Sequence, residues 1–186
     1  MGKIILVTGG SRSGKSSYAL EVGQSVPGPH FFIATCPMTD DEMKTRIEAH
    51  QRERLAGDWK TIEQETEIGK ALETVEESAV VLVDCLTLWV NNLMYRDEKE
   101  FENITEEDME EFSSEVIRKC RKRKGITIFV SNEVGMGIVP GNKQTRLYRD
   151  LVGRCNQAFA TEADAVVLVV CGIANFIKGE LNDAIT

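Results

Sequence analysis

The hydrophobic positions of the chain gather in short, nearly continuous runs and do not alternate with polar ones. Five runs have the length of a strand, and they cover residues 3–8, 30–35, 79–86, 126–132 and 165–173. Continuous apolar runs are typical of strands that helices cover on both faces. The segments between the runs have helical composition, so the chain predicts a βαβα order and a mostly parallel sheet. The segment "WKTIEQE" predicts one more short strand within residues 59–65.

Helix boundaries are readable at two places. Thr39 precedes a segment with three acidic residues in its first turn, and Thr105 precedes the helical segment 106–124, which stops at Gly125. The second segment runs from acidic to basic, a polarity that matches the helix dipole. Its basic end, residues 118–124, could also be a nucleic-acid patch, but we interpret it as a helix carboxyl end because the whole chain is acidic.

Length and charge narrow the class of protein. The chain has 186 residues, which fits one domain spanning 1–186, and its formal net charge is -8. A general nucleic-acid binder needs a basic surface, so we expect no nucleic-acid partner. No apolar stretch reaches the roughly 20 residues that span a bilayer, and the first residues do not resemble a signal peptide. We therefore expect a cytoplasmic protein without a membrane partner.

The five cysteines are scattered, without a CxxC pair or metal-ligand spacing. An odd number of unpaired cysteines indicates a reducing compartment. Cys36, Cys85 and Cys171 each end an apolar run, and we interpret them as small buried residues.

A phosphate-binding motif follows the first apolar run. Its pattern is G-x-x-x-x-G-K-[ST], and its residues are Gly9, Gly10, Ser11, Arg12, Ser13, Gly14, Lys15 and Ser16. In such a loop the backbone N–H groups surround a polyphosphate, the lysine reaches the β- and γ-phosphates, and the serine hydroxyl binds Mg²⁺. Because the motif lies between a predicted strand and a predicted helix, it predicts nucleoside triphosphate binding.

An acidic residue supports this prediction. Asp84 ends the buried run "VVLVD", at the strand position where a metal-assisting carboxylate belongs in such folds. The alternative is an aspartate that caps the next helix.

The chain has two histidines, and only one suggests chemistry. His30 opens a strand, and we interpret it as structural. His50 lies in a predicted helix that follows the second strand, on one face with Ile47 and Arg54. An imidazole that reaches the α-phosphorus of a triphosphate would permit nucleotidyl transfer, whereas a histidine beyond reach would leave plain phosphoryl transfer. A histidine at the edge of the core is the alternative interpretation.

A third unusual segment covers residues 129–157. Here a strand ends in Ser131, Asn132 and Glu133, and a glycine-rich loop and a helix with several arginines follow. Polar groups at a strand end, then a loop and arginines, suit a site that closes over phosphates. An ordinary glycine-rich turn before a solvated helix is the alternative.

Several segments together resemble one family closely, the bifunctional adenosylcobinamide kinase / adenosylcobinamide-phosphate guanylyltransferases of cobalamin biosynthesis. The resemblance covers most of the chain in the right order, and its segment "NEVGMGIVP" is far more specific than the phosphate loop. The segments are "LVTGGSRSGKS", "FIATCPMTDDEMKTRIEAHQRER", "WKTIE", "VLVDCLTLWVNNL", "SNEVGMGIVPGN", "RLYRDLVGRCNQ" and "VVLVVCGI".

The resemblance implies two reactions. ATP or GTP phosphorylates the aminopropanol hydroxyl of adenosylcobinamide, and GMP then passes from GTP to that phosphate through a guanylylated histidine, with release of pyrophosphate. The histidine maps onto His50, with Lys15 as the second catalytic residue and Mg²⁺ at Ser16 and Asp84. The other implied nucleotide contacts outside the phosphate loop are Ala34, Thr35, Cys36, Arg54, Glu63 and Asp84.

The resemblance also implies an α/β fold of the P-loop NTPase class, RecA-like, with a mostly parallel sheet flanked by helices, and a homotrimer. It leaves open whether Asp84 contacts metal or nucleobase. We expect the corrinoid to lie partly between subunits, near Arg146 and Arg149. Two alternatives are a plain small-molecule kinase with a structural histidine and a nucleotide-switch ATPase.

Overall fold

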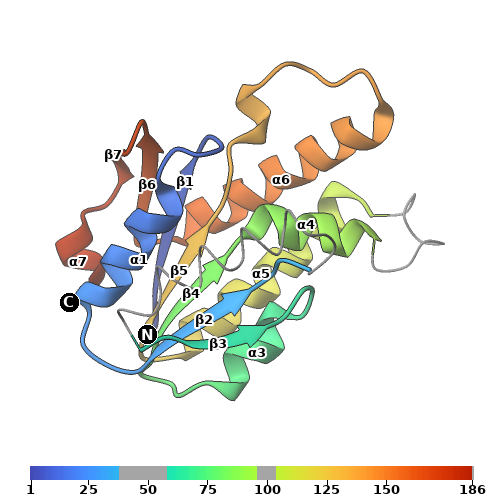
Figure 1. Ribbon diagram of the computed structural model, residues 1–186. Coiled ribbons are helices and arrows are strands. Elements are labelled where there is room, and N and C mark those ends of the chain that lie inside the picture. Colours follow the sequence, from blue (N-terminus) through green and yellow to red (C-terminus); the bar gives the residue numbers. More distant parts are fainter. Residues whose placement is uncertain (38–57, 96–103, 186) are drawn as a thin grey trace.

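The computed structural model describes residues 1–37, 58–95 and 104–185. One sheet of seven strands runs through them in the order β3-β2-β4-β5-β1-β6-β7 (Figure 1). All neighbouring strands pair in parallel except β7, which is antiparallel to β6. The strands are β1 (Lys3–Gly9), β2 (His30–Ala34), β3 (Lys60–Glu63), β4 (Val80–Asp84), β5 (Ile126–Val130), β6 (Ala165–Val170) and β7 (Ile173–Lys178). The predicted α/β class with a mostly parallel sheet is confirmed, and so is the short strand within 59–65.

Strand β7 is the difference from the sequence prediction. The apolar run 165–173 was expected to be one strand, but the chain turns back at Cys171 and Gly172, whose φ angles are 52° and 78°. Positive φ at both central residues is typical of a two-residue hairpin turn. A turn of this kind has a backbone twist that matches the twist of the two flanking strands. Cys171 is therefore exposed at a turn, and Cys36 is only partly buried, whereas Cys85 is buried as expected.

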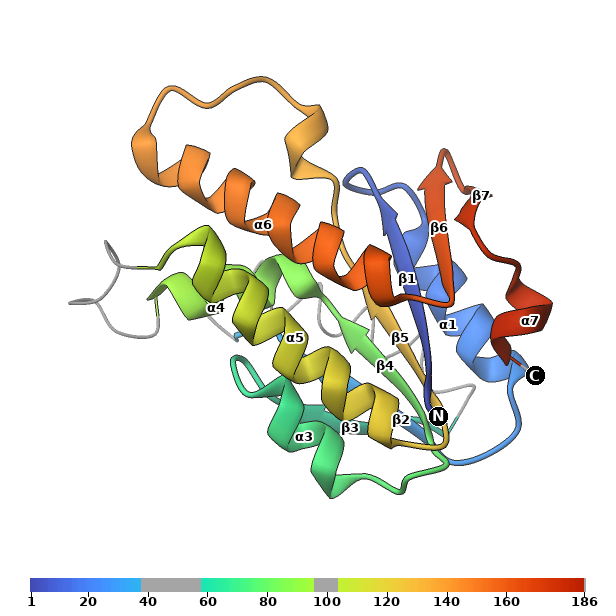
Figure 2. The same cartoon turned by 180° about the vertical axis from the view of Figure 1, so that it is seen from behind.

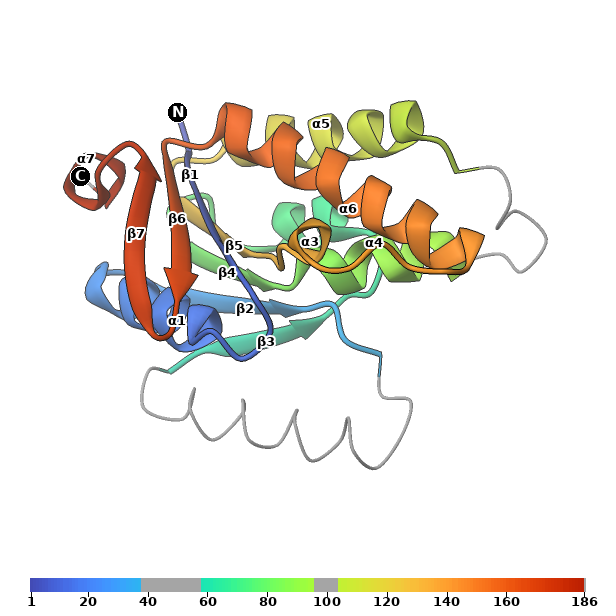
Figure 3. The same ribbon diagram turned by 90° about the horizontal axis from the view of Figure 1, so that it is seen from above.

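Helices cover both faces of the sheet. Because successive residues of a strand point to opposite faces, β1 gives Ile4 and Leu6 to one face and Ile5 and Val7 to the other. Helices α5 and α6 lie side by side on the first face (Figure 2), and α1 covers the second (Figure 3). The helices are α1 (Lys15–Ser25), α3 (Ile68–Thr74), α4 (Leu86–Tyr95), α5 (Glu106–Lys122), the 3-10 turn η2 (Val134–Met136), α6 (Lys143–Glu162) and α7 (Leu181–Ile185).

The predicted start of α5 is confirmed in detail. Thr105 Oγ1 accepts a hydrogen bond from the Asp108 amide at 3.2 Å, and the Thr105 amide donates to Asp108 Oδ2 at 2.8 Å. This reciprocal pair satisfies amides that the first turn of a helix leaves without partners. The helix predicted after Thr39 lies outside the described residues. Within the described ranges, no helix combines the length and the apolar character that crossing a membrane requires.

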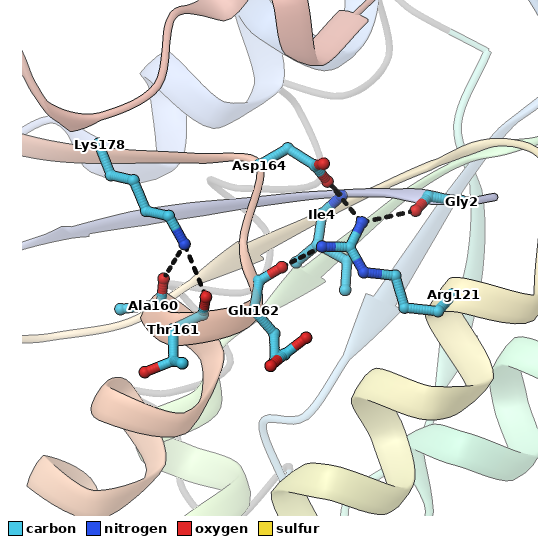
Figure 4. A network of polar contacts seen from close by, with 8 residues as sticks. All are labelled: Gly2, Ile4, Arg121, Ala160, Thr161, Glu162, Asp164 and Lys178. Atoms are coloured by element: carbon cyan, nitrogen blue, oxygen red, sulfur yellow. Dashed lines mark hydrogen bonds and ion pairs between the residues drawn. The ribbon is translucent and has the colours of Figure 1, made fainter.

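The basic end of α5 joins elements of the fold (Figure 4). Arg121 donates to Gly2 O at 2.9 Å, to Asp164 Oδ2 at 2.7 Å and to Glu162 O. Arg123 donates to Leu72 O of α3 and to Glu76 O and Ala79 O between α3 and β4, each at 3.0 Å. Two of the cations in 118–124 thus bind backbone carbonyl groups of neighbouring elements. This agrees with the interpretation of 118–124 as a helix carboxyl end, which we preferred to a nucleic-acid patch.

Candidate nucleotide site

The phosphate loop connects β1 to α1 and is shaped by close backbone contacts. A Cβ atom at Gly9 would lie 2.4 Å from Val169 O and 2.8 Å from Ser13 Oγ, so only glycine fits there. Gly14 has a φ of 93° and is the N-cap of α1. A glycine N-cap has no side chain to cap the first amides of the helix, which leaves those amides for an anion.

Lys15 is held against the backbone of this loop. It is the first residue of α1 and only 8% exposed, and its Nζ donates to Gly10 O at 3.1 Å. A buried ammonium next to N–H groups and a helix amino end is a strong local source of positive potential in an acidic chain. Such a place attracts a phosphate without requiring a basic surface.

A pocket of about 520 Å³ opens beside the loop, at the carboxyl ends of the parallel strands. In α/β sheets this edge is where ligands bind. Its lining comes from the phosphate loop, the ends of β2, β4 and β5, the start of α4, and α6. The lining residues are Ser11, Arg12, Ser13, Gly14, Lys15, Ser16, Ser17, Phe32, Ala34, Cys36, Asp84, Cys85, Thr87, Leu88, Asn132 and Tyr148.

The pocket brings together many of the residues singled out in the sequence. Those that line it are Ser11, Arg12, Ser13, Gly14, Lys15, Ser16, Ala34, Cys36 and Asp84. Gly9 and Gly10 shape the loop behind them. Glu63 lies on β3, opposite Ala34 in the sheet, and does not line this pocket as far as the described residues define it. His50 and Arg54 lie outside the described residues.

Thr35 stands apart because its side chain is fully buried. Its Oγ1 donates to Cys85 O at 2.8 Å and accepts from the Cys85 amide at 2.7 Å. This pair of bonds ties the end of β2 to the end of β4. The structure therefore gives Thr35 a role in holding the strand ends beside which a nucleotide would lie.

Three polar lining residues that come from outside the phosphate loop were not singled out as site residues. Thr87 lies in the first turn of α4, Asn132 follows β5, and Tyr148 lies on α6. The position of Asn132 at a strand end was a usable signal, and the sequence had marked its segment as polar. Thr87 and Tyr148 had no such signal, because they reach the pocket only through the packing of α4 and α6.

The segment after β5 is fixed by a polar network. Asn156 of α6 donates to Asn132 O and to Glu133 Oε1, both at 3.1 Å, and accepts from Ser131 Oγ at 2.6 Å. Thr8, at the end of β1, donates to the same Glu133 oxygen at 2.7 Å. Strand ends β1 and β5 and helix α6 are thereby held in one arrangement.

The arginines of α6 have partners close by. Arg146 Nη1 donates to Pro140 O at 3.1 Å and to Gly141 O at 2.7 Å, and Arg154 pairs with Glu106 of α5. In this arrangement they support the loop after β5 and the contact between α5 and α6. Their predicted contact with phosphates stays a prediction.

Two lining groups have raised pKa values. Burial, and then the nearby Asp84 carboxylate, raise the pKa of the Cys85 thiol to about 11. Burial, and then Cys85, raise the pKa of the Tyr148 hydroxyl to about 12. Both groups therefore stay protonated near pH 7 and add no charge to the pocket beside the Asp84 carboxylate.

The pocket fits Mg²⁺ through oxygen donors. Ser16 and Asp84 line the same cavity, and Mg²⁺ in nucleotide sites is typically held by one or two protein oxygens together with phosphates and waters. The described residues contain no cluster of three or more His, Cys, Asp or Glu side chains that could hold a metal. Such an ion would thus take its remaining ligands from the nucleotide and from water.

Comparisons with known proteins agree over nearly the whole chain. The model of the CobU family, described as cobinamide kinase / cobinamide phosphate guanyltransferase, matches residues 5–177. The bifunctional adenosylcobalamin biosynthesis protein CobU of Escherichia coli is 38% identical over 184 residues, with 94% of this chain and 99% of that protein covered. The CobU protein of Salmonella typhimurium is 37% identical, with coverage of 94% and 99%. The bifunctional adenosylcobalamin biosynthesis protein CobP of Pseudomonas aeruginosa is 35% identical, with coverage of 94% and 97%.

Proposed function

The chain belongs to the CobU family of cobinamide kinase / cobinamide phosphate guanyltransferases, and we propose that it catalyses both reactions on adenosylcobinamide. In the first, ATP or GTP phosphorylates the aminopropanol hydroxyl. In the second, GMP from GTP is transferred to the new phosphate and pyrophosphate is released. The observation that carries the proposal is that one pocket joins Lys15 and Ser16 of the phosphate loop to the Asp84 carboxylate.

In the kinase reaction the protein supplies position and charge. The amides of the phosphate loop hold the triphosphate, and the Lys15 ammonium stabilises the negative charge that grows on the leaving oxygens. The substrate hydroxyl attacks the γ-phosphorus in line with the departing nucleoside diphosphate. Holding both groups in this geometry supplies much of the rate.

In the guanylyl transfer His50 is the proposed carrier. A neutral imidazole nitrogen attacks the α-phosphorus of GTP, pyrophosphate leaves, and an oxygen of the substrate phosphate then breaks the P–N bond. His50 and Arg54 lie outside the described residues, so the proposal for them depends on imidazole chemistry and on the family resemblance. Outside the phosphate loop, the other nucleotide contacts that we propose are the ones predicted from the sequence. They are Ala34, Thr35, Cys36 and Glu63.

Mg²⁺ completes the proposed site. Ser16 and Asp84 would hold it, and the ion would supply electrostatic stabilisation of the phosphate charge. Replacement of Lys15 or Ser16 by alanine would then affect both reactions, because both use the same triphosphate position. The homotrimer and the cytoplasmic location stay predictions.

The decisive experiment is covalent labelling with α-labelled GTP. The wild-type chain should retain label after denaturation, His50→Ala should retain none, and Lys15→Ala should lose labelling because the triphosphate is no longer held. His30→Gln is the matched control, because His30 is not among the described residues that line the pocket, and its Nε2 lies within hydrogen-bond distance of the carbonyl oxygens of Gly23 and Val26. Wild-type label mapped to a peptide without His50 would contradict the histidine carrier.

The alternatives predict different results. A plain kinase with a structural histidine would phosphorylate cobinamide but take up no label from α-labelled GTP. A nucleotide-switch ATPase would hydrolyse triphosphate slowly and transfer nothing to a corrinoid. Assays of the wild-type chain with cobinamide, ATP and GTP separate the three.

A further inference from the structure

The lining of the pocket has parts with different chemistry. The phosphate loop and the start of α1 form one part of the lining and carry its two cationic residues, Arg12 and Lys15. Thr87 of α4, Asn132 after β5 and Tyr148 of α6 form another part, which is uncharged, and the ends of β2 and β4 lie in the lining as well. Helices α1 and α6 lie on opposite faces of the sheet (Figure 3). Because residues of both helices line the pocket, it is formed by elements from both faces.

We infer that the part formed by Thr87, Asn132 and Tyr148 is the acceptor subsite, in which Asn132 holds the substrate hydroxyl that receives the phosphoryl group. The inference rests on the proposed function and adds to it the place of the second substrate. In-line transfer requires the acceptor on the far side of the γ-phosphorus from the leaving oxygen. The polar side chains that line the pocket outside the phosphate loop and α1 include Asp84, which we propose for Mg²⁺, and the uncharged Thr87, Asn132 and Tyr148. Asn132 and Tyr148 both hydrogen-bond to Thr87, so these three residues form one group that is left for the acceptor hydroxyl.

Asn132 has the hydrogen-bonding capacity for this role. Its Nδ2 donates to Thr87 Oγ1 at 2.9 Å, and within the described ranges of the chain its Oδ1 makes no hydrogen bond. An amide oxygen has two lone pairs and accepts readily from a hydroxyl. An alcohol therefore finds an acceptor atom here that does not carry the negative charge of a carboxylate.

Asn132 is also held firmly in place. The Ser131 amide donates to Val7 O at 3.0 Å, and the Glu133 amide donates to Gly9 O at 3.1 Å. Asn156 donates to the carbonyl oxygen of Asn132 itself. The residue that we assign to the acceptor is thus joined directly to the strand that leads into the phosphate loop, so its distance from the triphosphate is set by the fold.

Tyr148 contributes a second polar atom. Its hydroxyl donates to Thr87 O at 3.2 Å, which leaves the phenolic oxygen able to accept. Because the hydroxyl stays protonated, it places no negative charge near the attacking oxygen. Asn132 and Tyr148 thus each present a neutral oxygen atom, and either of them can accept the one proton that an alcohol donates.

The transfer step balances without any further reactant. The acceptor oxygen forms a bond to the γ-phosphorus, and the bond from that phosphorus to the bridging oxygen breaks. The electron pair leaves with the nucleoside diphosphate, and the hydroxyl proton is released to water. Asn132 orients the hydroxyl and takes no proton, so its loss should weaken acceptor use without affecting the nucleotide.

The experiment measures acceptor and nucleotide separately. For Asn132→Ala we expect the KM for cobinamide to rise roughly tenfold to a hundredfold, as for loss of a hydrogen bond to a substrate polar group. The Kd for a fluorescent GTP analogue and the rate of protein labelling by α-labelled GTP, which need no acceptor, should stay within about twofold. Tyr148→Phe removes one acceptor oxygen. We expect a smaller rise in the KM for cobinamide, and again no change in nucleotide binding or labelling beyond about twofold.

Asn175→Ala is the matched control, because Asn175 is exposed on β7. The subsite is overturned if Asn132→Ala and Tyr148→Phe keep the wild-type KM, or if nucleotide binding or labelling weakens as much as cobinamide use. Tyr148→Phe tests the same subsite independently if Asn132→Ala does not fold. A wild-type chain that does not phosphorylate cobinamide would overturn the proposed function, a result distinct from either variant outcome.

Discussion

Three buried thiols show how surroundings control the chemistry of a single residue. Cys85, Cys120 and Cys155 are buried, and burial is the largest cause that raises their pKa values from the ordinary 9.0 to about 11, about 12 and about 12. The folded state therefore keeps these protons at pH values where the unfolded chain has lost them. The resulting stability is complete below pH 9 and is lost as the pH rises from 9 toward 11 or 12.

We predict from this a steep alkaline loss of stability. Each thiol contributes a slope of about 1.4 kcal/mol per pH unit in that window, with a decrease in the free energy of unfolding as pH rises. Urea unfolding at several pH values between 8 and 11 measures it. Cys155→Ala should reduce the slope, whereas Cys171→Ala, at an exposed position, should leave it unchanged. Equal slopes in the wild-type chain and Cys155→Ala would contradict the prediction.

At the scale of elements, Arg123 connects a helix to a loop on the same face of the sheet. Its side chain is 6% exposed, and its guanidinium donates to Leu72 O, Glu76 O and Ala79 O. These carbonyl oxygens end α3 and lead into β4, and Arg123 itself follows the last turn of α5. One cation therefore joins a carbonyl group near the end of α3 to two in the segment that leads into β4.

We predict that Arg123→Gln destabilises the fold by about 2 kcal/mol or more, because a shorter neutral side chain leaves buried carbonyl oxygens without their donor. Arg118→Gln is the control, since Arg118 is an exposed neighbour on α5 and should change the stability by about 0.5 kcal/mol or less. Urea unfolding of both variants gives the comparison. Similar losses in the two variants would show that the basic end of α5 acts by its charge alone.

Local signals explain which elements the sequence predicted. Helix α5 was predictable because Thr105 and Gly125 mark its ends within the sequence itself. The hairpin of β6 and β7 was missed because the apolar run continues through Cys171, and the single glycine after it was the only local sign of a turn. The reversal depends on packing against the phosphate loop, where Gly172 N–H donates to Ser13 O at 2.8 Å.

The candidate site also has a part that the sequence predicted and a part that it did not. The phosphate loop is contiguous in the sequence, so its glycines, Lys15 and Ser16 were predictable from their spacing alone. Tyr148 and Thr87 reach the pocket from α6 and α4, and which helix faces meet there is decided by the packing of the core. Sequence spacing does not contain that information, which is why one part of the pocket was predicted and the other was not.

At the scale of the whole molecule, the end of the chain stabilises its beginning. Lys178 of β7 donates to Ala160 O at 2.9 Å and Thr161 O at 2.6 Å near the end of α6 (Figure 4). Helix α7 packs beside β1, and Ala184 is fully buried in the core that α1 covers. The last residues therefore support the strand and the helix on either side of the phosphate loop.

We predict that Ala184→Asp lowers the free energy of unfolding by about 2 kcal/mol or more, because it buries a carboxylate among apolar neighbours. Asn175→Asp adds the same charge at an exposed position on β7 and should have little effect. Because no residue of α7 lines the pocket among those that the structure describes, GTP with Mg²⁺ at about 100 times its Kd should stabilise both variants and the wild-type chain alike, by about 2.7 kcal/mol. Thermal unfolding with and without nucleotide measures both effects. If Ala184→Asp were as stable as Asn175→Asp, α7 would not be part of the core. If GTP with Mg²⁺ did not stabilise Ala184→Asp, the end of the chain would control the phosphate loop as well as the stability of the fold.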